Sequence, residues 1–181
     1  KPLTDIVIRD YALKVFQEEF PLDAKANILG MERKGEQVMI RFVDREDGVE
    51  KLENFDYVLA ATGRSPNVKD FGLENTGLEL DSRGVPIFDP VTMQCGDSSI
   101  FIAGDANNVL PLLHEAADEG LIAGDNAGRF PEIIPRVRRS PLSIVFCDPQ
   151  IAMVGQAWRE LEGQENVVVG KLSFEGQGRS R

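Results

Sequence analysis

Two short apolar runs, each ending at a glycine, restrict the fold of this chain more than any other feature. The first run covers residues 55–61 and stops at Thr62-Gly63. The second covers residues 100–103 and stops at Gly104-Asp105. A nearly continuous apolar run of this length is typical of a strand that is buried on both faces of a sheet. Because a predicted helix follows the second run, the sequence favours an α/β fold.

Two longer helices are predicted. One covers residues 111–127, and its proline at position 111 suits the first turn of a helix. The other covers residues 5–20, where Thr4 or Asp5 can cap the amino end.

The remaining pattern consists mainly of short strands. Residues 24–53 predict an antiparallel meander, with turns at Lys34-Gly35-Glu36 and Glu46-Asp47-Gly48. The other expected elements are strands near residues 85–88, 142–147, 151–154 and 166–174, and a short helix at 156–162.

Composition excludes several classes of protein. Acidic residues number 30 and basic residues 20, so the net charge is −10 and no nucleic-acid partner is expected. The single histidine, His114, excludes a His-rich metal site, and no metal ligands are assigned. Cys95 and Cys147 form neither a disulfide framework nor a thiol redox motif, which fits a reducing, cytoplasmic location. No apolar run approaches the roughly 20 residues of a membrane span, so no membrane partner is expected.

Asp105 is the strongest candidate for contact with a ligand. It follows a predicted strand at its carboxyl end, where open α/β sheets bind ligands. Gly104 before it would let a ligand or another backbone approach closely. A carboxylate accepts hydrogen bonds, so its partner would be a hydroxyl or amide of the ligand. A plainer alternative is that the Asp105 side chain caps a turn.

The start of the following helix strengthens the case for a ligand. Leu112, Leu113 and His114 are predicted to lie near the same strand ends. Free backbone N–H groups at the amino end of a helix favour an electron-rich or anionic ligand group. His114 is a candidate contact and not a catalytic base, because no Ser or Cys nucleophile lies near it in the sequence.

The rest of this helix is interpreted structurally. A stripe of small residues predicts close packing on a sheet; its members are Ala116, Gly120, Ala123 and Ala127. Glu115, Asp118 and Glu119 suit the helix dipole without a further role. The arginines at residues 136–139 are interpreted as a solvated linker, with contact to an anion as the alternative.

Three motifs, in this order, resemble one protein family. YVLAATGRSPN at residues 57–67 and TMQCGDSSIFIAGDAN at residues 92–107 resemble the second half of the flavin-dependent pyridine nucleotide–disulfide oxidoreductases. FCDPQIAMVG at residues 146–155 is similar to the strand pair that opens the interface domain of that family. The spacing between Asp105 and His114 is most similar to that of the dihydrolipoamide dehydrogenases.

The resemblance implies contacts to FAD. Asp105 would hydrogen-bond the cofactor near its ribityl–phosphate portion, and Gly104 would allow the approach. Leu112, Leu113 and His114 would form the helix start that faces the flavin pyrimidine ring.

The resemblance also implies an NAD site and a domain order. Gly63 would lie near the nicotinamide dinucleotide, and Ala26 would make a backbone contact to its adenine half. The implied fold is a fragment of the three-layer FAD/NAD(P)-binding fold plus the start of an α+β interface (dimerisation) domain. Residues 1–67 would end the NAD-binding domain, residues 68–138 would form the second FAD-binding segment, and residues 139–181 would begin the interface domain.

The implied parent enzyme is a homodimer that passes electrons from a dithiol through a cysteine disulfide and FAD to NAD. Dihydrolipoamide, free or on a lipoyl carrier, is the leading substrate. The 181 residues contain neither a cysteine pair spaced by four residues nor a Gly-x-Gly-x-x-Gly turn. No catalytic residue is therefore assigned, and the fragment itself is expected to be inactive and to retain no cofactor. The alternatives are mercuric reductase, glutathione reductase, a flavin transhydrogenase, or a stand-alone binding or interaction module.

Overall fold

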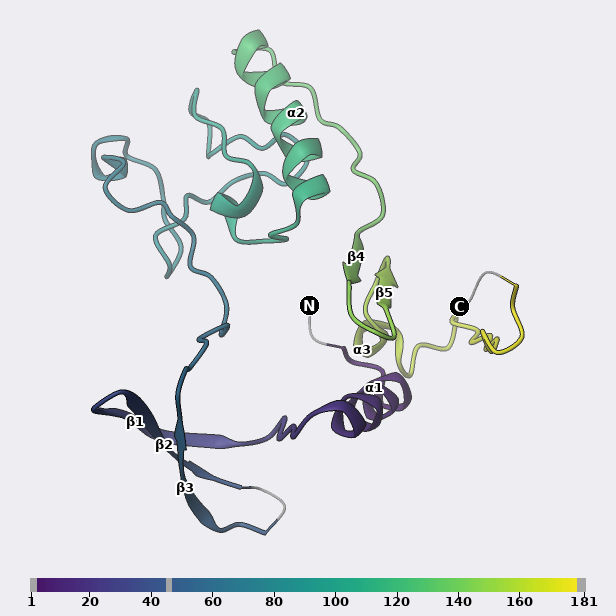
Figure 1. The fold of residues 1–181 in the computed structure, drawn as a ribbon. Coiled ribbons are helices and arrows are strands. Elements are labelled where there is room, and N and C mark those ends of the chain that lie inside the picture. Colours follow the sequence, from purple (N-terminus) through teal and green to yellow (C-terminus); the bar gives the residue numbers. More distant parts are fainter. Residues whose placement is uncertain (1–2, 45–46, 179–181) are drawn as a thin grey trace. The chain divides into compact units, whose positions relative to one another are not determined.

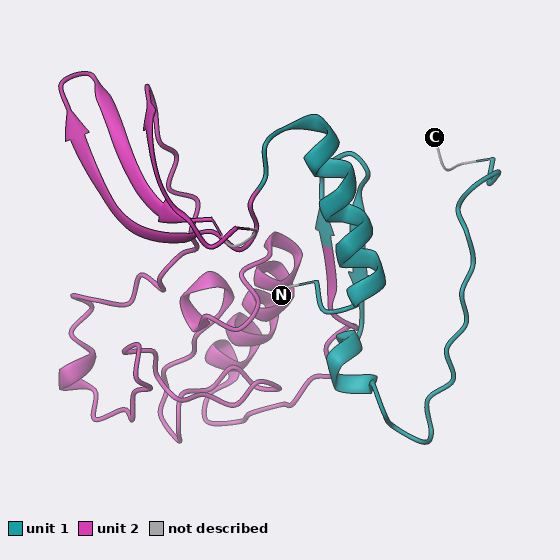
Figure 2. Ribbon diagram, turned by 90° about the horizontal axis from the view of Figure 1, so that it is seen from below, with its two compact units in different colours: residues 1–22, 144–181 teal, residues 23–143 magenta. Residues whose placement is uncertain are grey.

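The computed structural model describes residues 3–44 and 47–178 of the chain (Figure 1). The chain divides into two compact units (Figure 2). One unit contains residues 23–143, and the other combines residues 1–22 with residues 144–181. Helices and strands occur together in the chain, as the sequence predicts.

The unit that combines the two ends of the sequence contains helix α1, Ile6–Glu19. Asp5 caps this helix, because its carboxylate accepts hydrogen bonds from the N–H of Val7 at 2.9 Å and of Ile8 at 3.1 Å. Pro21 follows shortly after the last turn and cannot continue it. The helix predicted over residues 5–20 is confirmed.

Strands β4 (Leu142–Val145) and β5 (Ile151–Val154) form a two-stranded sheet, and the short helix α3 (Trp158–Leu161) follows them, as predicted. The strand predicted at residues 166–174 is wrong, because the described part of the chain has no strand after β5. Val168 in this segment is 96% exposed. An apolar segment without a neighbouring strand has no partner for its backbone hydrogen bonds and gains nothing from an extended ladder.

The predicted antiparallel meander is confirmed, with strand order β1-β2-β3. Its strands are β1 (Asn27–Lys34), β2 (Gln37–Val43) and β3 (Glu50–Phe55). Gly35 turns the chain between β1 and β2 with a φ of 62°, a conformation that favours glycine. Glu46 of the second predicted turn lies outside the described residues. No side chain of the three described strands is buried, so the sheet depends on its backbone ladder.

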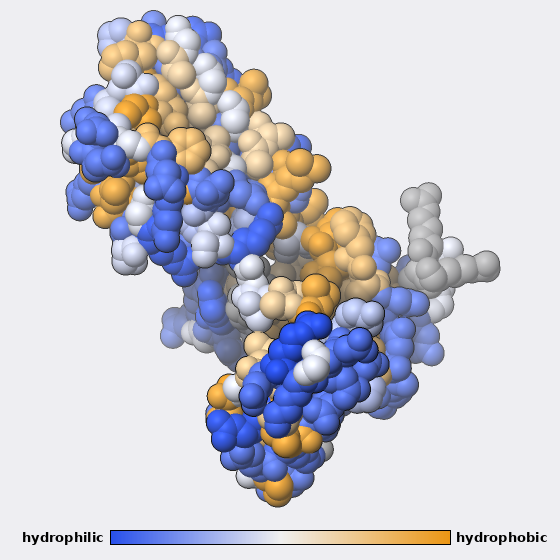
Figure 3. Space-filling model, turned by 60° about the vertical axis from the view of Figure 1, so that its left-hand side comes forward, coloured by the Kyte–Doolittle hydropathy of each residue, from blue (hydrophilic) through white to orange (hydrophobic). Residues whose placement is uncertain are grey.

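The first apolar run, residues 55–61, does not form a buried strand, and this prediction is wrong. Only Phe55 belongs to a strand, as the last residue of β3. Tyr57 is 93% exposed and Leu59 is 89% exposed. A strand buried on both faces needs neighbouring strands and covering layers, and the described chain supplies neither here. Other large apolar side chains are also exposed, and orange atoms are spread among blue ones over the face shown in Figure 3.

The second apolar run, residues 100–103, is half-buried and pairs through a single bridge instead of forming a strand. Phe101 of this run bridges Gln94. The strand predicted near residues 85–88 is likewise reduced to isolated bridges, one of them between Phe88 and Cys95. Both predictions therefore assigned these segments more regular structure than they have, and the run at residues 100–103 is half-buried where a buried strand was predicted.

The core of the larger unit lies in this irregular region. Its buried apolar side chains are Val68, Val85, Met93, Cys95 and Ile122. Met93 and Cys95 are fully buried, and burial raises the pKa of the Cys95 thiol. A thiol held protonated in an apolar interior is a packing group, as the sequence suggests for this cysteine.

Helix α2, Leu113–Arg129, packs against this core and starts and ends two residues later than predicted. Its buried residues are Glu115, Glu119, Ile122 and Asn126. The predicted small-residue packing stripe is confirmed only at Ala116, which lies close to Gly104; at Gly120 it is wrong, since Gly120 is exposed and a Cβ added there would meet nothing within 4 Å. The buried face of α2 is mostly polar, and polar side chains in an interior require partners.

Candidate functional site

Gly104 is buried and begins the 3₁₀ helix η2, Gly104–Asn107. Its φ is 70°, and an added Cβ would lie 3.1 Å from the Cβ of Ala116 in α2. Glycine is therefore needed twice, for the left-handed backbone and for the close approach of the helix. Of the two uses foreseen for Gly104, the close approach of another backbone is observed.

Asp105 follows at the surface, with 48% of its side chain exposed. The Oδ2 atom lies 2.7 Å from Nη1 of Arg64, which comes from the segment after the first apolar run. Nη2 of the same guanidinium donates a hydrogen bond to the carbonyl of Pro111 at 3.1 Å. Within residues 3–44 and 47–178, no backbone N–H of the turn donates to the Asp105 carboxylate, so the turn-capping alternative has no support.

The start of α2 lies beside η2, and the two elements contact each other. Leu112 is the N-cap residue, and its side chain accepts no hydrogen bond from the first turn. The first N–H groups of a helix have no partner within the helix, so they can meet a ligand or water. Leu113 is 89% exposed, and Nε2 of the exposed His114 lies 2.8 Å from the carbonyl oxygen of Leu142.

Gly63 precedes Arg64 and has a φ of 118°, a conformation reserved almost entirely for glycine. The ion pair of Arg64 therefore brings the segment of Gly63 toward Asp105 and the start of α2. Ala26 lies just before β1, and among the described elements the sheet that β1 opens contacts neither α2 nor η2. Six of the seven predicted site residues thus lie in segments joined around Asp105, and Ala26 does not.

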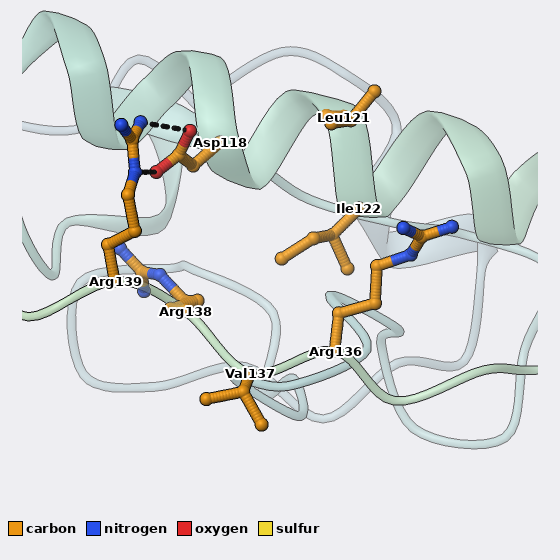
Figure 4. A pocket seen from close by; sticks show the side chains of 7 residues that line it. All are labelled: Asp118, Leu121, Ile122, Arg136, Val137, Arg138 and Arg139. Carbon is orange, nitrogen blue, oxygen red and sulfur yellow. Dashed lines mark hydrogen bonds and ion pairs between the residues drawn. The ribbon is translucent and has the colours of Figure 1, made fainter.

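The arginines at residues 136–139 are paired with acidic residues of α2, so their interpretation as a solvated linker is correct only in part: Arg139 is 76% exposed, but Arg138 is 18% exposed. Arg139 donates to Asp118 at 2.6 and 2.8 Å (Figure 4). Arg138 pairs with Glu115 and, at 2.9 Å, with Glu119. The acidic residues attributed to the helix dipole are therefore also the anchors of this segment.

Ion pairs with arginine side chains lower the pKa values of two carboxyl groups on α2. The guanidinium of Arg139 holds the pKa of Asp118 below its usual value. Arg136, and to a smaller extent Arg129, lowers the pKa of Asp125 in the same way. A pocket opens between the helix and the arginine segment, lined by Asp118, Leu121, Ile122, Arg136, Val137, Arg138 and Arg139 (Figure 4).

Sequence reasoning missed the residues that hold the site together. They are Arg64, Asn107, Glu119, Asn126 and Arg138. A usable signal was present for one pair: Glu115 and Glu119 are spaced by four residues on one helix face, and a dense arginine cluster follows the helix. Arg64 offered no such signal, because its partner lies 41 residues away in the sequence.

Two further properties bear on the chemistry. Among residues 3–44 and 47–178, no group of three or more His, Cys, Asp or Glu side chains is arranged to hold a metal ion. In the same described part of the chain, no helix combines the length and the apolar character needed to cross a membrane.

Comparisons with known proteins identify relatives. Residues 3–120 match the family described as pyridine nucleotide-disulphide oxidoreductase. The chain is 36% identical over 140 residues to a dihydrolipoyl dehydrogenase of Chlamydia pneumoniae, which covers 77% of this chain and 28% of that protein. It is 34% identical over 155 residues to a dihydrolipoyl dehydrogenase of Bacillus subtilis, which covers 83% of this chain and 31% of that protein. The chain thus spans about a third of the length of the curated relatives it matches.

A solved structure gives the same fold. The copper(II) complex of the HOCl-induced flavoprotein disulfide reductase RclA from Escherichia coli matches with a TM-score of 0.72 and 20% identity, covering 88% of this chain and 35% of that one. This likeness confirms the α/β fold class, and the family match spans two of the three motifs that carry the resemblance. The chain belongs to the pyridine nucleotide-disulphide oxidoreductase family.

Proposed function

We propose that this chain is part of a flavin-dependent dithiol–disulfide oxidoreductase that passes electrons from dihydrolipoamide through a cysteine disulfide and FAD to NAD. The names of the curated relatives support the dithiol. One observation carries the cofactor assignment: an exposed carboxylate, Asp105, lies in the turn that packs against the uncapped start of α2.

The residues at this place fit FAD chemically. Arg64 pairs with Oδ2 of Asp105, so Oδ1 stays available to accept a hydrogen bond from a ribityl hydroxyl. The first N–H groups of α2, near Leu112, Leu113 and His114, would face the electron-rich edge of the flavin pyrimidine ring. Bound FAD would supply an acceptor for the electron pair taken from the dithiol.

The NAD contacts and the domain order belong to the same proposal. Gly63 would lie near the nicotinamide dinucleotide, and Ala26 near its adenine half. Residues 1–67, 68–138 and 139–181 would contribute to the NAD-binding, FAD-binding and interface domains. The whole protein would act as a cytoplasmic homodimer on a free or carrier-bound dithiol.

The experiment is a flavin-binding measurement on the full-length protein. Asp105→Ala should weaken FAD binding, since a charge-assisted hydrogen bond contributes roughly 1.5–3 kcal/mol. Asp97→Asn makes a similar charge change at an exposed position and should bind FAD like the wild type. Equal FAD affinity of the Asp105→Ala variant and the wild type would remove Asp105 from the cofactor site.

The 181-residue chain expressed alone should be colourless and should not oxidise dihydrolipoamide. Its sequence lacks the cysteine pair and the glycine-rich turns that the reaction requires. Flavin absorbance after purification, together with a dithiol oxidation assay, tests this expectation. A yellow preparation with stoichiometric flavin would contradict it.

A further inference from the structure

Glu119 is a buried carboxylate at the centre of the polar face of α2. Its side chain is 1% exposed. The Oε2 atom accepts hydrogen bonds from the backbone N–H of Gly104 at 2.7 Å and from Nδ2 of Asn107 at 2.6 Å. The same oxygen therefore holds the residues on both sides of Asp105.

The other carboxylate oxygen of Glu119, Oε1, has the guanidinium of Arg138 beside it. Oε1 accepts no well-directed hydrogen bond among the described residues and lies 2.9 Å from Nη1 of Arg138. The side chain of Arg138 is 18% exposed and also pairs with Glu115. A carboxylate in an interior needs a nearby opposite charge, and the guanidinium of Arg138 supplies it for Glu119.

A hydrogen bond between Asn107 and Val109 also stabilises the turn from within. Oδ1 of Asn107 accepts the N–H of Val109 at 3.0 Å, and Asn107 is 4% exposed. Asp105 is thus the exposed member of a turn in which Gly104 and Asn107 are buried and hydrogen-bonded. Displacement of the backbone that carries Asp105 would require the bonds from Gly104 and Asn107 to Glu119 to break.

We infer that Glu119, held by Arg138, is a positioning residue that fixes the Asp105 carboxylate for its ligand. The inference rests on the proposed function, in which that ligand is the ribityl portion of FAD. Glu119 itself touches no ligand. It acts through the backbone of Gly104 and the side chain of Asn107, and the arginine segment acts through Glu119.

The test compares charge-neutralising variants in the full-length protein. Glu119→Gln keeps the shape of the side chain but loses the charge that Arg138 faces. We expect its FAD affinity to fall by about tenfold, the size of one charge-assisted hydrogen bond. The backbone amide of Gly104 should exchange its hydrogen faster in the absence of FAD. Arg138→Met should reproduce both effects, and Arg138→Lys should restore FAD affinity in part.

Asp118→Asn is the matched control. It neutralises a neighbouring acid of α2 that pairs with the same arginine segment, but Asp118 has no hydrogen bond to the 104–107 turn among the described residues. Its FAD affinity should stay within about twofold of the wild type, as expected for an exposed ion pair. An equal loss of FAD affinity in the Asp118→Asn variant would show that general destabilisation, and not positioning, is responsible.

The outcomes separate this inference from the function on which it rests. Wild-type affinity for FAD in both Glu119→Gln and Arg138→Met overturns the positioning role alone. A wild-type full-length protein that takes up no FAD overturns the proposed function and the inference with it. If Glu119→Gln does not fold, the contrast between Arg138→Met and Asp118→Asn decides the question by the same two measurements.

Discussion

The meander of β1, β2 and β3 and the region around α2 are stabilised in opposite ways. The meander is the most regular part of the chain, yet none of its described strand residues is buried. The region around α2 has isolated bridges and 3₁₀ turns, yet it contains the fully buried side chains Met93, Cys95, Glu119 and Asn126. Regular backbone pairing and a buried core are therefore separate sources of order in this protein.

The comparison shows where substitutions should matter. A sheet held by its ladder is sensitive to turn geometry and tolerant of side-chain changes. An irregular region held by buried polar groups is sensitive to the loss of single side chains, because each removal leaves unpaired groups in the interior. Four predictions test this difference, in order of decreasing effect.

Asn126→Ala should have the largest effect. The side chain is fully buried and donates to the carbonyls of Thr92 at 3.0 Å and Ile134 at 3.1 Å, while it accepts the N–H of Ile134 at 2.9 Å. Its removal leaves several buried groups unpaired and should lower the free energy of unfolding by about 3 kcal/mol. Urea denaturation measures the change. Asn54→Ala on exposed strand β3 is the control and should cost less than about 0.5 kcal/mol; equal losses at both positions would abolish the contrast between the regions.

Gly104→Ala should come next. The new Cβ would meet Ala116 at 3.1 Å, and the backbone φ of 70° is strained for alanine. Together these effects should cost about 2 kcal/mol. Gly120→Ala in the open middle of α2 should instead stabilise the protein by about 0.5–1 kcal/mol, because alanine favours a helix. Thermal unfolding shows whether each variant is more or less stable than the wild type. A stabilised Gly104→Ala variant would contradict the close approach of α2.

Gly35→Ala tests the meander. Its Cβ would meet nothing within 4 Å, so the expected cost of about 1 kcal/mol comes only from the backbone φ of 62°. Hydrogen exchange should accelerate in β1 and β2 and stay unchanged in α2, since these described elements make no contact. Faster exchange throughout α2 would show that the two regions unfold as one.

Acidification should change the stability of the folded protein least among the four predictions. The pKa of Asp118 is lowered by Arg139, and that of Asp125 by Arg136 and Arg129. A lowered pKa means that the folded state binds fewer protons than the unfolded state, so the stabilisation is present above the ordinary Asp value of about 3.9. It is lost as the pH falls through the lowered pKa values. Denaturation between about pH 2 and pH 6 should show a weaker pH dependence in Asp118→Asn than in the wild type; identical curves would mean that the ion pair contributes nothing.

The elements with strong local signals could be predicted from the sequence. Asp5 caps α1, Gly35 turns the meander, and the β4–β5 pair forms from two short apolar segments that are close in the sequence. Each of these depends on residues close together in the chain. The family was also readable, because the motifs at residues 57–67 and 92–107 are contiguous strings.

The candidate site was predicted only in part, for the same reason. Gly104 and Asp105 stand out as a glycine and a carboxylate after an apolar run. Nothing local shows that Arg64 pairs with Asp105, because the two residues meet only in the folded chain.

The burial of the apolar runs and of α2 was decided by tertiary structure. Whether residues 55–61 are a buried strand depends on neighbours that pair with them, and their own composition does not supply these. Likewise, Gly120 and Glu119 are adjacent in the helix, and spacing alone favoured the small residue as the packing contact. Glu119 is the buried residue of the two because Gly104, Asn107 and Arg138 all contact its carboxylate. These contacts offset the free-energy cost of moving a carboxylate out of water.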